Sequence, residues 1–163
     1  MHSLAKKFMM ARKLDFGENG NAELLDDQVF LMDASMFSKI AENTGKEGAY
    51  KIGESVGKSL ASNIRKTGIS GTKMIEFMMD LLTMMGLGDF ELHDFDIKEK
   101  KGEVRVKNSL PSRKSEEKEN AGCQIIAGIV SGIFSQNYEK EFKVTEKGCI
   151  LEGDDLCRFK IQS

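Results

Sequence analysis

The placement of three cysteines constrains this chain of 163 residues more than any other feature, because all three lie in its last third. Cys149 and Cys157 bracket a step of eight residues across a predicted hairpin, and Cys123 falls in the first turn of the predicted helix before them. The three thiols can therefore meet near one end of the hairpin. An odd number of cysteines does not form a disulfide framework, so metal binding and ordinary burial remain the two interpretations.

Hydrophobic periodicity predicts an α+β fold. Apolar residues recur every three or four positions in some segments and alternate with charged residues in others. The patterns predict, in chain order, an N-terminal hairpin or arm over 1–27, a strand at 28–32, helices at 34–42, 46–66 and 72–85, a hairpin at 89–98 and beyond 101–102, a helix at 120–136, and strands at 140–144 and 156–161. The order β-α-α-α-β-β-α-β-β predicts an antiparallel sheet covered by helices, in one domain over 1–163.

A polar segment separates the central hairpin from the last helix. Residues 107–119 are rich in charge and contain the only proline, Pro111. This composition predicts an exposed connecting loop, which is also the best candidate for a lid over a binding site.

Charge and hydropathy exclude several classes of protein. The formal net charge is −2 and the charged residues are interspersed, so we expect no nucleic-acid partner. The longest apolar run, 123–134, is far shorter than a membrane-spanning helix, which needs about 20 residues. The N-terminus lacks the apolar core and cleavage site of a signal peptide, so we expect a cytoplasmic protein.

No catalytic residue is predicted. The two histidines, His2 and His93, have no Ser, Cys or Asp at the spacing of a nucleophilic triad, and each reads as a surface or hydrogen-bonded side chain. Asp154 and Asp155 follow Gly153, where aspartate is favoured for turn formation. Glycine motifs that bind phosphate or dinucleotide do not occur in the sequence.

Three motifs in the last third stand in a characteristic order. They are Cys123 at the head of an apolar helix rich in small residues, then Glu146-Lys-Gly-Cys149, then Gly153-Asp-Asp-Leu-Cys157-Arg-Phe159. In order and spacing they resemble the 4-vinyl reductase domain, which is also the sensor domain of phenol- and xylene-responsive bacterial activators.

The resemblance implies a zinc site whose ligands are Cys123, Glu146, Cys149 and Cys157. Three thiolates and a carboxylate fill a tetrahedral shell and leave no position for water, which is the arrangement of a structural zinc. Such a site carries a charge of about −2, which backbone amides or a cation such as Lys147 or Arg158 can offset.

A methionine-rich helix at 72–85 suggests a pocket for apolar molecules, although ordinary core filling explains it equally well. The candidate lining residues are Met74, Phe77, Met78, Leu81, Phe90, Ile126, Ala127 and Val144. By the resemblance, phenol sensors carry aromatic residues at the positions of Ala127 and Val144, so phenol itself is disfavoured as the ligand.

Small residues in the last helix allow another backbone to approach closely. They are Ala121, Gly128, Gly132 and Ser135. We favour internal packing against the sheet over the alternative, a homodimer interface.

Three functions follow from these observations. The first is a zinc-stabilised binding or sensor domain for a small hydrophobic or aromatic molecule. Because the activators append an ATPase and a DNA-binding domain for which this chain has no room, the signal would pass to a separate partner. The second is a reductase, or a reductase accessory protein, for a tetrapyrrole-like vinyl substrate. The third is a dimeric scaffold, since related folds serve in vesicle-tethering complexes. We favour a function without catalysis.

Overall fold

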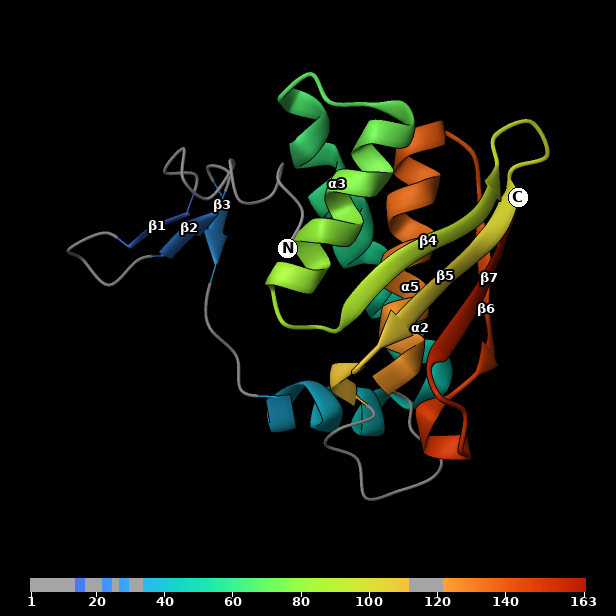
Figure 1. The fold of residues 1–163 in the computed structure, drawn as a ribbon. Helices are drawn as coiled ribbons and strands as arrows, with labels where there is room; N and C mark the ends of the chain where they lie inside the picture. Colours follow the sequence, from blue (N-terminus) through green and yellow to red (C-terminus); the bar gives the residue numbers. More distant parts are fainter. Residues whose placement is uncertain (1–13, 17–21, 25–26, 30–33, 112–121) are drawn as a thin grey trace.

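Helix α5 (Gly122–Tyr138) lies at the centre of the fold and is buried on almost every side. In the computed structural model, which describes residues 14–16, 22–24, 27–29, 34–111 and 122–163, it runs between a sheet and helix α2 (Ala34–Lys66) (Figure 1). Helix α3 (Gly71–Met84) packs beside it, against the first strand of the sheet. A helix that is apolar all round suits such a central position, because it meets protein on each side.

The main sheet has four antiparallel strands in the order β4-β5-β7-β6. They are β4 (Asp89–Asp96), β5 (Lys101–Lys107), β6 (Lys143–Gly148) and β7 (Cys157–Gln162). Alternate residues such as Val104, Phe159 and Ile161 face the helices and are fully buried, whereas their neighbours in each strand are more exposed. The predicted α+β class and antiparallel sheet are confirmed.

Several predicted boundaries need correction. The helices predicted at 34–42 and 46–66 are one element, α2, which bends at Gly45 with φ of 65° instead of ending there. Glycine accepts this left-handed conformation without strain, so the chain resumes the helix after the bend. The last hairpin also differs, because β6 starts at Lys143 and continues to Gly148, beyond the predicted strand at 140–144.

The N-terminal segment forms more strand than predicted. Strands β1 (Leu14–Phe16), β2 (Ala22–Leu24) and β3 (Asp27–Val29) pair in a separate antiparallel sheet in that order. The predicted strand at 28–32 overlaps the end of β3, and residues 30–33 lie outside the described residues.

The predicted loop at 107–119 is described only in part. Lys107 still belongs to β5, and residues 112–121 lie outside the described residues. The interpretation of this segment as a lid therefore stays a prediction.

Glycines bring α2 and α5 into backbone contact. A Cβ atom added at Gly128 or Gly132 would overlap the carbonyl oxygens of Tyr50 and Glu54 in α2. Gly53 in α2 is packed in the same way against the carbonyl of Ile125, as is Gly57 against that of Ile129. The close approach predicted for α5 is thus internal, but its partner is α2 and not the sheet.

Polar side chains hold α5 to the elements around it. Asn137 makes two hydrogen bonds of 3.0 Å with the backbone of Gly71 at the start of α3. Ser131 donates to the carbonyl of Phe142 at 2.7 Å, and Ser135 accepts from the amide of the same residue at 3.0 Å. These bonds place the beginning of β6 beside α5. None of the helices in the described ranges has the length and hydropathy needed to cross a membrane.

Candidate metal centre

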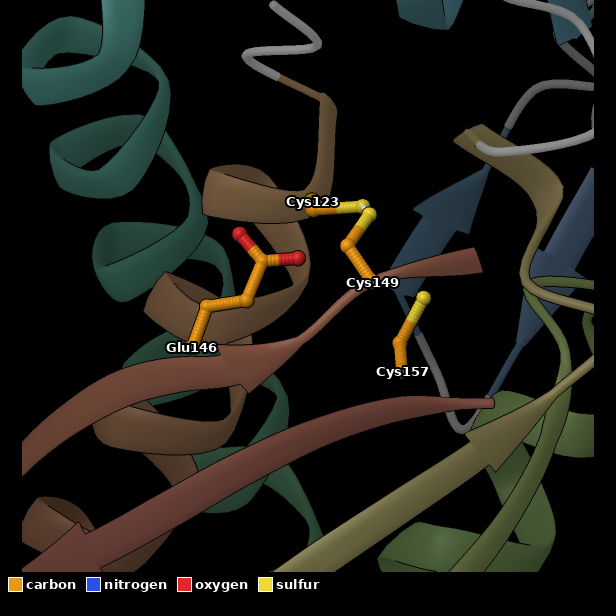
Figure 2. A group of neighbouring side chains, drawn as sticks. All are labelled: Cys123, Glu146, Cys149 and Cys157. Atoms are coloured by element: carbon orange, nitrogen blue, oxygen red, sulfur yellow. Dashed lines mark hydrogen bonds between the residues drawn. The ribbon is translucent and has the colours of Figure 1, made fainter. Parts of the chain in front are cut away.

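Four side chains converge where the start of α5 meets the hairpin of β6 and β7 (Figure 2). Cys123 lies in the first turn of α5, Glu146 in β6, Cys149 directly after β6, and Cys157 at the start of β7. One sulfur or oxygen atom from each lies within 4.8 Å of all the others, and the Sγ atoms of Cys123 and Cys149 are 3.6 Å apart. The four residues that sequence reasoning selected therefore form one cluster that could hold a metal ion.

An irregularity in β6 lets Glu146 and Cys149 share this cluster. In a regular strand, residues three positions apart point to opposite faces. Here the register shifts after Glu146, which pairs with Phe159, so that Gly148 pairs with Arg158 and β6 contains one extra residue. The bulge turns the end of the strand, and Cys149 faces the interior together with Glu146.

A turn supports the backbone of Cys149. The side chain of Asp154 accepts the amide hydrogen of Cys149 at 2.9 Å, and the amide of Asp154 donates to the Cys149 carbonyl at 3.2 Å. Gly153 precedes it with φ of 101°, which a residue with a side chain rarely adopts. The interpretation of Asp154 as a turn residue is confirmed.

Arg158 places a positive charge beside the cluster. Its Nη2 atom lies 3.3 Å from Oδ1 of Asp154 and donates to the carbonyl of Lys147 at 3.5 Å. Gly148 makes room for this pair, because a Cβ atom there would meet both Asp154 and the Arg158 guanidinium. Of the two cations predicted to offset the site, Arg158 contacts the hairpin through its side chain, whereas Lys147 supplies its carbonyl.

The electrostatics of the cluster favour a dication. Hydrogen bonding to the Cys149 and Cys157 thiols, burial and the nearby Glu146 carboxylate all raise the pKa of the Cys123 thiol. Burial likewise raises the pKa of the Glu146 carboxyl. Both groups are thus disfavoured as anions until a positive charge lies between them.

The donor set and its spacing fit zinc. Tetrahedral zinc with Zn–S bonds of about 2.3 Å places its sulfur ligands about 3.8 Å apart, close to the 3.6 Å between Cys123 and Cys149. Oε2 of Glu146 accepts a hydrogen bond of 3.0 Å from Gln124, whereas Oε1 is buried and accepts none within the described part of the chain. A buried carboxylate oxygen without a donor is what a metal ion would satisfy.

Two residues at this site were missed by sequence reasoning. They are Gln124, which binds Glu146, and Gly148, which makes room for Arg158. The position of Gln124 next to Cys123 was the available signal for the first, and a glycine inside the Glu-x-x-Cys motif was the signal for the second.

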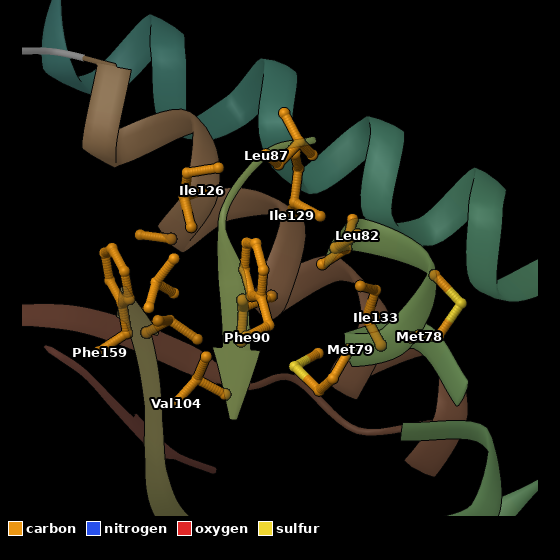
Figure 3. Close-up of a cluster of buried hydrophobic side chains, with 14 of the residues drawn as sticks. Met78, Met79, Leu82, Leu87, Phe90, Val104, Ile126, Ile129, Ile133 and Phe159 are labelled. Atoms are coloured by element: carbon orange, nitrogen blue, oxygen red, sulfur yellow. The ribbon is translucent and has the colours of Figure 1, made fainter. Parts of the chain in front are cut away.

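The predicted pocket residues all lie in one buried apolar cluster. Met74, Phe77, Met78, Leu81, Phe90, Ile126, Ala127 and Val144 are each exposed by 6% or less. Figure 3 shows Met78, Phe90 and Ile126 among side chains from α3, α5 and the sheet. Their burial agrees with a core and with the wall of a binding site, so the pocket stays a prediction.

His93 has an ordinary role at the sheet surface. Its Nε2 atom lies 2.8 Å from Oδ2 of Asp94, and about a third of its side chain is exposed. The interpretation as a surface or hydrogen-bonded histidine is confirmed for His93, and His2 lies outside the described residues.

Comparisons with known proteins agree with this arrangement. The model of the 4-vinyl reductase domain matches residues 103–163, the range that contains all four residues of the cluster. The uncharacterized protein MJ1460 of Methanocaldococcus jannaschii is 30% identical over 127 residues, which cover 78% of this chain and 72% of that protein.

Three solved structures share the fold. The phenol-responsive sensory domain of the transcription activator PoxR, solved with phenol, superposes with a TM-score of 0.76 at 20% identity and covers 99% of this chain and 91% of that one. A vinyl-4-reductase family protein from Methanocaldococcus jannaschii gives 0.62 at 22% identity, with 82% and 83% covered.

The third is a trafficking protein particle complex subunit 3 from Naegleria fowleri, covalently bound to palmitic acid, which gives a TM-score of 0.59 at 16% identity, with 80% and 96% covered. These similarities extend the agreement from the motifs of the last third to the arrangement of helices and sheet. The chain belongs to the 4-vinyl reductase domain family.

Proposed function

We propose that this chain is a zinc-stabilised binding domain that senses a small hydrophobic or aromatic molecule. The observation that carries the proposal is the buried cluster of three thiols and one carboxylate beside the apolar interior. Four protein donors complete a tetrahedral shell, so the ion would brace the fold and take no part in chemistry.

The cluster and the predicted pocket share the same elements. Ile126 and Ala127 follow Cys123 by three and four residues, which places them near its face of α5. Val144 precedes Glu146 by two residues and lies on the same face of β6. A zinc ion at the cluster would thus hold in place two walls of the apolar interior.

The fold is one that carries apolar molecules in other proteins. The PoxR domain responds to phenol, and the trafficking subunit holds palmitic acid. In this chain the corresponding interior offers methionine and phenylalanine side chains, which suit ligands of varied shape. The small side chains of Ala127 and Val144 disfavour phenol and favour a larger apolar molecule.

Metal analysis tests the zinc site. We expect about one zinc ion per chain in the purified protein by mass spectrometry, and its loss in Cys149→Ser, because a hydroxyl replaces a thiolate ligand. Glu152→Gln, an exposed position between the two ligands of the hairpin, should keep its zinc. A wild-type protein free of metal and equally stable would remove the proposal.

Ligand binding tests the pocket. We expect native mass spectrometry to detect a co-purified apolar molecule, and thermal shifts to detect binding of toluene, indole or decanoate at high concentration. Met78→Leu should change the affinity for the responding compound at least about threefold while keeping the fold, because it alters the wall at nearly constant volume. Met85→Leu, at a residue that is 48% exposed, is the matched control and should leave the affinity unchanged.

The route of the signal is part of the same proposal. A separate partner protein, and the pairing of two copies of this chain, are the two routes that follow from the sensor hypothesis. Sedimentation at micromolar concentration, with and without the responding compound, measures whether copies associate.

A further inference from the structure

The two carboxylate oxygens of Glu146 have different surroundings. Oε2 accepts a hydrogen bond of 3.0 Å from the side-chain amide of Gln124. Oε1 is buried and accepts no hydrogen bond from the residues that the structure describes. Figure 2 shows the carboxylate on the side of the cluster that faces Cys123 and Cys149. One oxygen is therefore held by the protein, and the other is left as a donor for a metal.

We propose that Gln124 is a positioning residue that makes Glu146 a ligand through one oxygen, Oε1, and thereby keeps the site four-coordinate. The inference rests on the proposed zinc site and concerns how its fourth ligand is controlled. A carboxylate whose second oxygen is engaged cannot easily chelate an ion through both oxygens. Ions that prefer more ligands are bound less well by such a site.

The type and place of the donor suit this role. Gln124 follows Cys123 directly on α5, so the helical turn that carries one metal ligand also carries the group that orients another. A neutral amide fixes the direction of the carboxylate and leaves its negative charge for the metal, whereas a Lys or Arg would neutralise that charge. Hydrogen bonds of this kind orient metal ligands in many proteins.

The simpler alternative is that Gln124 only packs between α5 and β6. Gln124→Met separates the two, because it preserves the length of the side chain and removes the donor. Gln136→Met is the matched control, a partly buried glutamine about three turns further along the same helix.

Chelator competition and cobalt spectroscopy provide the test. We expect Gln124→Met to weaken zinc binding about 10- to 100-fold. Its cobalt(II) form should show weaker visible bands than the wild type, because intensity falls when coordination rises from four to five. Gln136→Met should match the wild type in both measurements. A Gln124→Met protein with wild-type affinity and wild-type cobalt bands would overturn the inference and leave the zinc site intact.

A double-mutant comparison distinguishes orientation from a general effect on the fold. In the Glu146→Ala background, Gln124→Met should change zinc affinity by less than about twofold, because the carboxylate it orients is gone. An equal loss in both backgrounds would show that Gln124 acts through folding and would overturn the inference. A wild-type chain that bound no zinc would instead reject the proposed function itself, together with this inference.

Discussion

Removal of zinc is expected to lower the melting temperature of this chain by about 8–16 °C. A site held at about a thousand times its dissociation constant contributes about 4 kcal/mol to the free energy of unfolding, and each kcal/mol shifts the melting temperature of a chain of this size by about 2–4 °C. The effect is large because the cluster joins the first turn of α5 to the β6–β7 hairpin, which are far apart in sequence. Without a dication, the raised pKa values of the Cys123 thiol and the Glu146 carboxyl disfavour their anions in the buried cluster.

Thermal unfolding with and without a chelator measures this effect, at one protein concentration and one total zinc concentration. Cys157→Ser should melt near the chelated wild type and should not respond to the chelator, since it already lacks a ligand. Chelator saturated with calcium is the control for non-specific effects. Equal melting temperatures for the wild type in all conditions would contradict a structural role for the metal.

The substitution Gly128→Ala is expected to destabilise the chain by about 3 kcal/mol or more. In most helices the same change stabilises by about 0.5–1 kcal/mol, because alanine has the higher helix propensity. The sign is reversed here because the new Cβ would overlap the backbone carbonyl of Tyr50 in α2. Backbone atoms of two packed helices cannot move aside as the end of a side chain can, so the helices would have to separate.

Chemical denaturation of Gly128→Ala measures the loss directly. Ser59→Ala, on the exposed side of α2, is the control and should change the free energy of unfolding by less than about 0.5 kcal/mol. Gly53→Ala should behave like Gly128→Ala, because its Cβ would overlap the carbonyl of Ile125 on the other side of the same contact. If all three variants were as stable as the wild type, the close contact of α2 and α5 would be wrong.

Local patterns were enough to predict most elements of this fold. Alternation of apolar and charged residues predicted β5 and β7, and the methionine stripe predicted α3 within a residue of its bounds. The motifs around Cys123, Cys149 and Cys157 indicated the cluster before any coordinates. These features depend on residues that are neighbours in the chain, and the side-chain periods of helix and strand are the same in every fold.

Other features were decided by contacts between distant segments. The bulge after Glu146 brings Cys149 to the inner face, and the motif alone does not state that β6 gains a residue there. The glycines of α5 could have met a sheet, a second chain or a helix, and only the packed structure shows that they meet Gly53 and Gly57 of α2. Gln124 gained its meaning only when Glu146, 22 positions away, came within 3.0 Å. Close approach, strand register and hydrogen-bond partners depend on how the whole chain packs, and so they lie beyond any local pattern.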